Sequence, residues 1–446
     1  MKKIDERFKL SLNKTNVRTE IFAGLTTFLT MAYVLVTQPA SIVGFGPVMS
    51  ITDSMGLVIS KEGILLLTAL VSAIVTLAMG LYANLPFALS TGMGMNFILG
   101  GMIQSGAITF GGAMTIVLIS GLLFVLISFL GIRELVVVMI PKNIKVGMCV
   151  IVGFLLGYLG MKDAGIIVVN PTGGFNFGSL DNPLQLISIA TVLLMAVLHA
   201  HKVKGSVLIG MLFATIVGIP FGVTVVPESL VSLPHFDKAA PLIFQLDFKG
   251  VLNVTMIPLI FIMFSGDFFA SLAAFIGLGA KAGFLDEDGN MENVQKPFIV
   301  DSIGTVFGSL FGSTTITTYA ESATGIEEGG RTGLTSVTTG ICLLLTLFLA
   351  PLFLMIPSAA TGPALIFVGF GLITEFKNLE LDDFTEAFPA IFMVLITAFT
   401  ASIPAAISAA VLIHVLLKVV TGKGKEIHGG LWGLSVFMLL YFIFGV

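Results

Sequence analysis

The stretch FGSLFGSTTITTYAESATGIEEGG, residues 307–330, decides how this chain is built. It is rich in Gly, Ser and Thr, a composition that disfavours a continuous helix. It nevertheless lies among long apolar runs, and it carries a carboxylate, Glu321. Non-helical backbone at membrane depth is tolerated only where it lines a cavity enclosed by protein, because unpaired N–H and C=O groups facing lipid are costly. The stretch therefore predicts extended or half-helical backbone beside an internal cavity.

A second stretch of the same kind, LPFALSTGMGMNFILG, covers residues 85–100, a little over 220 residues earlier. A weaker internal similarity links VGFLLGYLGM (152–161) to VGFGLITEF (368–376). Interrupted segments at corresponding places in two halves are typical of inverted-repeat transporters, with the binding site at the repeat interface. The alternative is that the small residues only let helices approach closely.

The composition indicates a polytopic membrane protein. Of 446 residues 56% are hydrophobic and 11% charged, and the mean hydropathy is +1.05. Apolar runs that can cross a hydrocarbon core of about 30 Å recur along the chain, so we expect helices and not the alternating strands of a barrel. A formal net charge of −4 gives no indication of nucleic-acid binding. The basic N-terminus lacks the features of a signal peptide, so the first span is expected to be retained.

About fourteen helical spans are expected, and their exact number near the C-terminus stays open. The candidate spans are 20–45, 62–82, 86–104, 110–131, 139–160, 183–199, 205–222, 254–280, 297–312, 320–329, 333–356, 358–375, 386–401, 403–420 and 430–446. Lys and Arg gather before the first span and in alternate loops, which the positive-inside rule assigns to the cytoplasm. We therefore expect a multi-pass protein of the cytoplasmic membrane with a cytoplasmic N-terminus.

Three acids lie within apolar spans: Asp267, Asp301 and Glu321. Each costs about 2.5–3.5 kcal/mol at a span centre unless it is protonated, finds a partner or faces water. No Lys or Arg in these spans offers a salt bridge. Protonatable carboxyls at membrane depth suit a proton symporter. The alternatives are a helix-capping role for Asp301 and a structural hydrogen bond for Asp267.

The surroundings of Glu321 favour a flat, neutral, hydrogen-bonding heterocycle as substrate. Threonines at 314, 315, 317 and 318 can hydrogen-bond loose backbone, and half-helix N–H groups point into the cavity. An inorganic anion is not favoured, since no cation compensates Glu321. The sequence has no zinc spacing, phosphate loop or nucleophile elbow. We therefore expect a transporter without metal or cofactor and not an enzyme.

Four motifs resemble those of a known family. They are NVRTEIFAGLTTFLTMAYVLVTQP, STGMGMNFILG, GSTTITTYAESATGIEEGGRTGLTS and TEAFPAIF, and they look like signatures of the AzgA-like purine permeases of the nucleobase/ascorbate transporter superfamily. The resemblance covers nearly the entire chain. It implies the uracil-permease fold, with fourteen helices in two inverted repeats of seven and broken segments in helices 3 and 10.

The resemblance also implies a division of the chain and a set of site residues. The expected parts are a cytoplasmic segment (1–19), a core domain (20–131 and 251–356) and a gate domain (132–250 and 357–446). By motif match, Glu321 and the backbone of Ala320 bind the base, with Asn96 and Thr318 nearby. Asp301 falls on the helix-9 acid that is associated with function, and Asp267, Asp301 and Glu321 are the expected proton-coupling groups.

The helix-8 motif departs from the family pattern. The family pattern resembles D-x-F-D-T-x-G-T, and here the stretch is DFFASLAA, so Asp267 keeps the first acid and Ala270 replaces the second. Asp267 lies about 4.5 Å along the helix axis from Ala270, on nearly the same face, and is a candidate substitute. The leading hypothesis is proton-driven import of adenine, guanine or hypoxanthine. The alternative is a transporter of altered specificity or an uncoupled facilitator. The expected partners are a nucleobase, a proton and membrane lipid, and a homodimer stays open.

Overall fold

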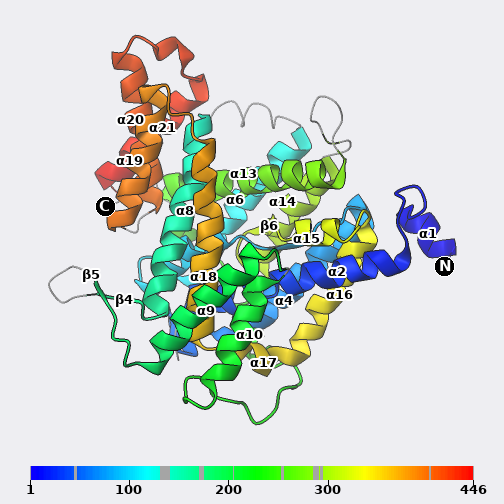
Figure 1. Ribbon diagram of the computed structural model, residues 1–446. Helices are drawn as coiled ribbons and strands as arrows, with labels where there is room; N and C mark the ends of the chain where they lie inside the picture. Colours follow the sequence, from blue (N-terminus) through cyan, green and yellow to red (C-terminus); the bar gives the residue numbers. More distant parts are fainter. Residues whose placement is uncertain are drawn as a thin grey trace.

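A computed structural model shows a helical membrane protein with a few short strands (Figure 1). It describes residues 2–44, 48–130, 141–169, 175–203, 205–252, 256–284, 291, 295–400 and 403–444. In this described part, eight helical segments are long and apolar enough to cross a bilayer, and three shorter apolar helices accompany them. The predicted all-helical polytopic class is thereby confirmed.

The first half of the chain runs through α12. Its helices are α1 (Lys2–Phe8), α2 (Val17–Met31), α3 (Val34–Val43), α4 (Lys61–Ala78), a π-helical turn (Met79–Ala83), α5 (Met93–Gln104), α6 (Phe110–Leu130), α8 (Lys142–Asp163), α9 (Pro183–Ala200), α10 (Ser206–Gly218), α11 (Phe236–Ala239), a 3₁₀ turn (Ala240–Leu242) and α12 (Phe248–Val251). Its strands are β1 (Ser50–Thr52), β2 (Val58–Ser60), β3 (Leu89–Thr91), β4 (Ile167–Val169) and β5 (Phe175–Phe177).

The second half contains one strand, β6 (Ile316–Thr318), among its described residues. Its helices are α13 (Ile257–Ala282), α14 (Gln295–Leu310), α15 (Ser322–Glu327), α16 (Gly333–Leu345), α17 (Ala350–Leu354), α18 (Ser358–Ile373), α19 (Phe384–Thr400), α20 (Ile403–Val420) and α21 (Gly429–Phe444). Short 3₁₀ turns cover Thr346–Leu349, Thr374–Asn378 and Gly424–Glu426.

Several helices begin where the sequence supplies a capping side chain. Asn16, Ser60 and Thr332 cap α2, α4 and α16, and each side chain accepts a hydrogen bond from a backbone N–H of the first turn. Such caps satisfy N–H groups that have no partner within the helix. The first expected span, 20–45, is divided into α2 and α3 at residues 32 and 33. This division places Tyr33 at a bend beside the interior.

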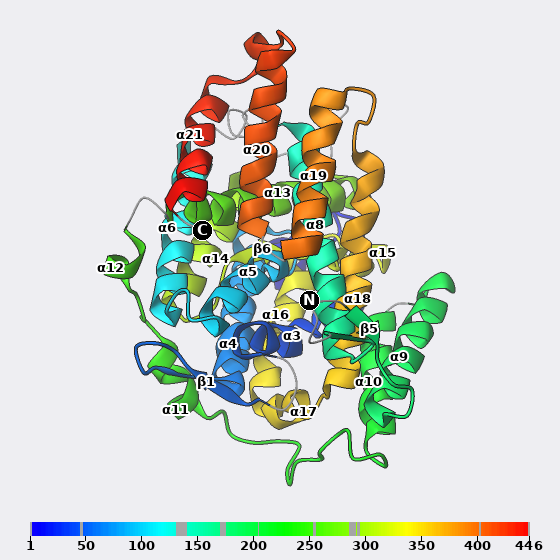
Figure 2. The same ribbon diagram turned by 90° about the vertical axis from the view of Figure 1, so that its left-hand side faces the viewer.

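The order of elements occurs twice, as the predicted inverted repeats require. Val17–Val43 (α2 and α3) and Gly333–Leu354 (α16 and α17) each form one divided span. With these spans, two helices, a strand followed by a short helix, and two more helices appear as α2–α3, α4, β3–α5, α6 and α8, and again as α13, α14, β6–α15, α16–α17 and α18. The contacts between the two copies correspond as well. Helix α6 of the first copy packs on α14 of the second, and their counterparts, α16 and α4, also pack together. Helices α8 and α18 pack along each other, and both views place them side by side (Figures 1 and 2).

The C-terminal region contains three helices after α18. Helix α19 packs on α20, and α20 packs on α21 (Figure 2). At one end of this group, Lys418 Nζ lies 3.0 Å from Glu386 Oε1 and 2.7 Å from Glu426 Oε2. Lys423 Nζ lies 2.6 Å from Asp383 Oδ2, and this ion pair holds the pKa of the Asp383 carboxyl well below its usual range. The ion pairs tie the loop before α21 to the start of α19.

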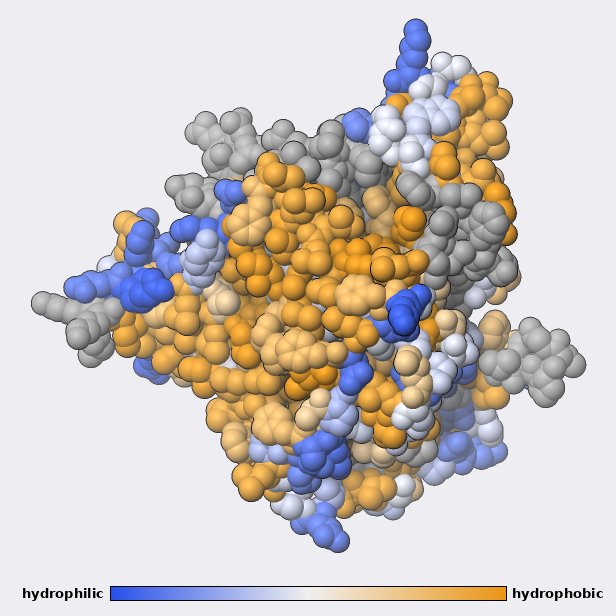
Figure 3. All heavy atoms as spheres, turned by 180° about the vertical axis from the view of Figure 1, so that it is seen from behind, coloured by the Kyte–Doolittle hydropathy of each residue, from blue (hydrophilic) through white to orange (hydrophobic). Residues whose placement is uncertain are grey.

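The outer surface is apolar over a wide area, as contact with lipid requires. Seen from behind, hydrophobic residues form a broad continuous face (Figure 3). Large side chains that are exposed include Leu122 and Phe129 on α6 and Leu193 on α9. An apolar face of this size would aggregate in water, whereas in a bilayer it contacts lipid tails.

A cluster of aromatic rings fills the space between α6, α13 and α14. Phe124 contacts Phe268 and Phe298 edge to face, with ring centroids 5.4 Å and 6.0 Å away, and Phe275 contacts Phe298 at 4.8 Å. These four rings are almost fully buried. Phe268 follows Asp267 in the sequence, so the cluster places apolar rings beside Asp267.

Candidate functional site

The two broken segments meet at the centre of the fold. Strands β3 and β6 pair antiparallel, with Leu89 opposite Thr318 and Thr91 opposite Ile316. The Tyr319 hydroxyl donates a 2.7 Å hydrogen bond to the backbone oxygen of Thr91, which adds a side-chain link between the halves. Both strands are buried. The strands bond each other on their facing edges, while the hydroxyls of Thr76 and Thr305 accept from the outward N–H groups of Leu89 and Ile316. Backbone without a continuous helix is thus given partners inside the protein.

Glu321 lies at the start of α15, one turn beyond β6, and is half-buried. The Tyr33 hydroxyl donates a 2.6 Å hydrogen bond to Glu321 Oε1. Ala320, next to Glu321, is exposed, and Tyr33 is 4% exposed. One carboxylate oxygen is therefore fixed by a buried tyrosine, and the residue before the carboxylate, Ala320, is exposed.

The threonines before Glu321 have partners other than those the sequence suggested. Thr314 bonds two amide side chains, and Thr317 Oγ1 lies 2.9 Å from Ser271 Oγ on α13. The hydroxyls of Thr315 and Thr318 are buried and have no hydrogen-bond partner within the described residues. Thr314 and Thr317 therefore join β6 and the segment before it to side chains on neighbouring helices, and not to loose backbone around Glu321. Thr318 is 4% exposed and lies behind the accessible surface.

Asn96 belongs to a closed ring of three buried polar side chains. Its amide nitrogen donates to Gln38 Oε1, Gln38 Nε2 donates to Thr314 Oγ1 at 3.2 Å, and the Thr314 hydroxyl donates to Asn96 Oδ1. None of the three side chains is more than 1% exposed. The ring joins α3, α5 and the segment before β6. It fixes the Asn96 amide, and in this conformation it keeps that amide away from open space.

Asp267 and Asp301 lie together behind β6. Thr305 on α14 donates a 2.7 Å hydrogen bond to Asp267 Oδ2, and its hydroxyl also accepts one from Ile316 N at 3.1 Å. Asp301 is fully buried and interacts electrostatically with Asp267. Ser271 is its neighbour, yet neither Asp301 oxygen has a hydrogen bond of good geometry to the described residues. Of the two buried carboxyls, Asp267 is thus linked to β6 through the Thr305 hydroxyl.

Ala270 and Asp267 face different surroundings. Ala270 is exposed, whereas Asp267 is 3% exposed and is held by Thr305. Three positions on a helix differ by about 60° in direction, which is enough to bring one side chain inside and leave the other outside. The Asp267 carboxyl therefore does not occupy the surface that a side chain at Ala270 would reach.

A cavity of about 380 Å³ lies between α3 and α5 on one side and α8 and α18 on the other. Its lining residues are Ser41, Phe97, Gly101, Gln104, Leu159, Lys162, Asp163 and Ser358. This volume is within the usual range for small-molecule sites, about 300–1,000 Å³. The Ser41 hydroxyl donates to the backbone oxygen of Gln38 at 2.7 Å, and Phe97 follows Asn96. The lining includes neighbours of the ring of Gln38, Asn96 and Thr314, but none of the predicted site residues.

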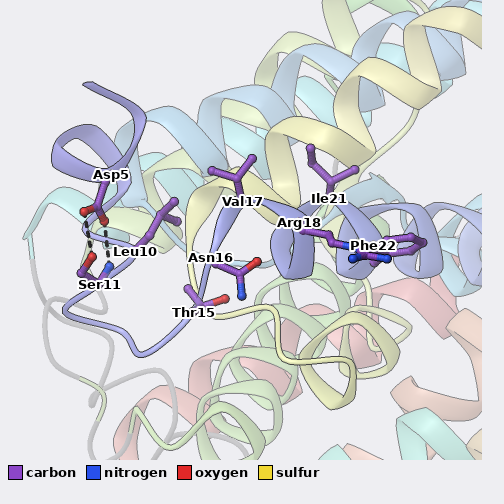
Figure 4. A pocket seen from close by; sticks show the side chains of 9 residues that line it. All are labelled: Asp5, Leu10, Ser11, Thr15, Asn16, Val17, Arg18, Ile21 and Phe22. Carbon is purple, nitrogen blue, oxygen red and sulfur yellow. Dashed lines mark hydrogen bonds between the residues drawn. The ribbon is translucent and has the colours of Figure 1, made fainter. Parts of the chain in front are cut away.

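A larger hollow lies at the N-terminal segment and contains none of the predicted site residues. Figure 4 shows its lining, from Asp5 to Phe22. Asp5 accepts hydrogen bonds from Ser11 N at 2.8 Å and from Ser11 Oγ at 2.7 Å, which lower the pKa of the Asp5 carboxyl. The hollow is open at the surface of the molecule, and Arg18 and Phe22 stack along its edge. It is therefore a surface feature and is separate from the strand pair.

Sequence reasoning missed Tyr33 and Gln38. Both lie in AYVLVTQP, within the first motif, and both are buried polar or amphipathic side chains in an otherwise apolar span. A buried glutamine within a membrane span needs a partner. That rule could have identified Gln38, whereas a tyrosine in such a span is also common at a membrane interface.

Comparisons with known proteins agree with the motifs. The chain matches the Permease family over residues 18–409. It is 32% identical to the guanine/hypoxanthine permease PbuG of Bacillus subtilis, over 96% of this chain and 97% of that protein. It is 30% identical to the adenine permease AdeP of Escherichia coli, over 99% of this chain and 96% of that protein.

Solved structures share the fold. The transmembrane domain of a cyanobacterium bicarbonate transporter, BicA, superposes with a TM-score of 0.63 at 17% identity, over 89% of this chain and 97% of that one. The anion transporter Slc26a9 of mouse, in its inward-facing state, gives a TM-score of 0.64 at 12% identity, over 92% of this chain and 69% of that one. At these identities the likeness concerns the fold alone.

Proposed function

The chain belongs to the Permease family, as the AzgA-like motifs indicated, and we propose that it imports purine nucleobases across the cytoplasmic membrane by proton symport. The observation that carries the proposal is the Glu321 carboxylate, half-buried, hydrogen-bonded to Tyr33 and beside exposed Ala320 backbone at the meeting point of β3 and β6. Relatives that cover nearly the whole chain are named guanine/hypoxanthine and adenine permeases.

The chemistry of the site suits a neutral base. Purine bases carry N–H groups on a flat ring, and a carboxylate accepts hydrogen bonds from such donors strongly because it is charged. Glu321 Oε1 is occupied by Tyr33, so Oε2 is the acceptor we assign to the base. Exposed Ala320 is the candidate for a further contact with the base, Thr318 supports it from behind, and Asn96 stabilises α5 through its ring of hydrogen bonds.

Movement in transport would follow the packing of the helices. We assign 20–131 and 251–356 to a core that carries the site, and 132–250 and 357–446 to a gate. In support, α4 and α16 pack together within the first set, and α8, α9 and α18 pack together within the second. The cavity between α5 and α8 lies at the boundary of the two sets. Sliding of one set against the other would open and close it.

Proton coupling is assigned to Asp267, Asp301 and Glu321. Both aspartates are buried, and carboxyl groups at membrane depth are typical carriers of protons in transporters. Thr305 joins Asp267 to the backbone of Ile316 in β6, so a proton gained or lost there acts on the strand that precedes Glu321. A change of protonation can thereby bias the conformation that binds the base.

A substitution of Glu321 tests the proposal. In cells that lack their own purine permeases, Glu321→Gln should lower uptake of radiolabelled guanine, hypoxanthine or adenine at least about tenfold, because a charged acceptor is lost. Glu380→Gln is the matched control, since the exposed Glu380 carboxylate pairs with Lys142 at the surface, at 2.6 Å, and the backbone bonds of Glu380 to Asn143 are kept. Equal uptake by Glu321→Gln and the control would remove Glu321 from the site.

The second candidate function is an uncoupled facilitator, which the exposed Ala270 favours because it takes the place of an acid in the family pattern. Uptake measured at several external pH values, with and without a protonophore, separates the two. A symporter slows at alkaline pH and with protonophore, and Asp301→Asn should abolish that dependence. Wild-type uptake that is insensitive to both would favour the facilitator. Thermal-shift measurements with a panel of bases would then identify the substrate.

A further inference from the structure

We propose that Glu20, at the far end of α2, is a positioning residue for Glu321. The proposal rests on the proposed function, since it requires that Glu321 binds the base. Glu20 lies in the first sequence motif, and it is not one of the residues proposed to bind the base or the proton. It is completely buried, although it is an acid on a membrane-spanning helix. A charge in that position must have partners, and the partners identify its role.

The Glu20 carboxylate receives hydrogen bonds from the loop that joins α15 to α16. Glu20 Oε1 accepts from Arg331 N at 2.9 Å. Glu20 Oε2 accepts from Thr335 Oγ1 at 2.6 Å, from Thr335 N at 3.2 Å and from Thr332 N at 3.3 Å. These donors lie in the first turn of α16 and just before it, where a helix leaves N–H groups unpaired and carries partial positive charge. The carboxylate is thus satisfied by the start of α16.

The same loop holds the end of α15. The Arg331 guanidinium donates to Ile326 O at 2.6 Å and to Gly330 O at 2.8 Å. Arg331 therefore links Glu20, through its backbone N–H, to the last turn of α15, through its side chain. Helix α15 has six residues and is only about 9 Å long. A displacement of its last turn is consequently transmitted to Glu321 at its start.

Helix α2 runs beside α15 and contacts it repeatedly. Thr30 Oγ1 lies 3.0 Å from Thr324 Oγ1, and the Gly325 Cα has no space for a side chain, since a Cβ there would lie 2.6 Å from Ala23 O. The line of contacts ends at Tyr33, whose hydroxyl bonds Glu321. Glu20 and Tyr33 are 13 residues apart, about 20 Å along the helix path. The contacts of α2 between Glu20 and Tyr33 therefore fix the position of α15.

Binding measurements test the proposal on the full-length purified protein. Glu20→Gln keeps the size of the side chain but replaces one acceptor oxygen with a donor. We expect the Kd for guanine, hypoxanthine or adenine, whichever binds wild type, to rise about tenfold. The matched control is Asp53→Asn. Asp53 also accepts three backbone hydrogen bonds, from Met55, Leu57 and Phe110, and it lies outside the line of contacts with α15.

Two further variants separate positioning from general stability. Arg331→Met removes the guanidinium bonds to α15 but keeps the backbone N–H that Glu20 accepts, so we expect a similar rise in Kd. If Glu20→Gln does not fold, this variant still tests the proposal. The double variant Glu20→Gln, Glu321→Gln should bind no more weakly than Glu321→Gln alone, because Glu20 acts through Glu321.

The outcomes are distinct. An unchanged Kd in Glu20→Gln and Arg331→Met, or losses that multiply in the double variant, would overturn the positioning role while leaving the transport function intact. An equal rise in Kd in Asp53→Asn would also overturn it, because the effect would then be general destabilisation. An unchanged Kd in Glu321→Gln would instead remove the proposed binding role of Glu321, and the positioning role with it.

Discussion

Replacing Tyr33 with Phe isolates one hydrogen bond at the candidate site. The change removes the hydroxyl that donates to Glu321 Oε1 at 2.6 Å and leaves the ring in place, so no void forms. Tyr33 is 4% exposed, and water cannot readily replace the lost donor. A hydrogen bond to a charged group is worth about 1.5–3 kcal/mol, which corresponds to a roughly 10- to 150-fold change in affinity. We expect base binding to weaken by about that factor, because Glu321 loses the contact that orients it.

The assay for Tyr33→Phe is the Kd of the base in purified protein, with initial uptake rates in cells as a second measurement. Tyr158→Phe serves as control, because Tyr158 lies on α8 and its ring packs on Phe175, 5.6 Å between centroids, away from Glu321. Binding by Tyr33→Phe that equals or exceeds wild type would refute the reasoning. It would mean that the base does not use Glu321 in the geometry seen here.

Three further predictions concern other parts of the structure. Gly325→Ala should lower the melting temperature and reduce base binding, because its Cβ would lie 2.6 Å from a backbone oxygen of α2; melting curves with and without base check this. Thr305→Val should leave Asp267 without its donor, and we expect the pH optimum of uptake to move relative to wild type. Asp383 has a lowered pKa in the folded state, so its contribution to stability is present above the ordinary carboxyl value of about 3.9 and is lost as pH falls below it. Asp383→Asn should therefore flatten the fall of melting temperature below about pH 5.

Local composition was sufficient to predict the broken segments. The stretches 85–100 and 307–330 contain β3 and β6, because Gly, Ser and Thr disfavour helix wherever they gather. The second stretch also identified Glu321 as a candidate, whereas Asn96 became one through the resemblance to the family. The class of membrane protein followed from hydropathy, which depends on residue type and not on packing.

Partners across the fold could not be predicted from local sequence. Tyr33 bonds Glu321, 288 residues away, and Gln38 bonds Thr314, 276 residues away. Helical periodicity gives the angle between Asp267 and Ala270, but only packing against α14 decides which of the two faces the interior. For the same reason, Thr314 and Thr317 bond side chains on other helices, whereas the sequence predicted backbone partners for them.

The pairing of β3 with β6 has a consequence for how the protein is made. Leu89 and its partner Thr318 are 229 residues apart in the chain. At synthesis rates of about 5–20 residues per second, roughly 10–45 seconds pass between the appearance of one strand and the other. During that interval β3 has no strand to bond, and its N–H and C=O groups cannot be left facing lipid. Thr76 can already bond Leu89 during that interval, but the groups of β3 that later face β6 need another partner than lipid until the second half arrives.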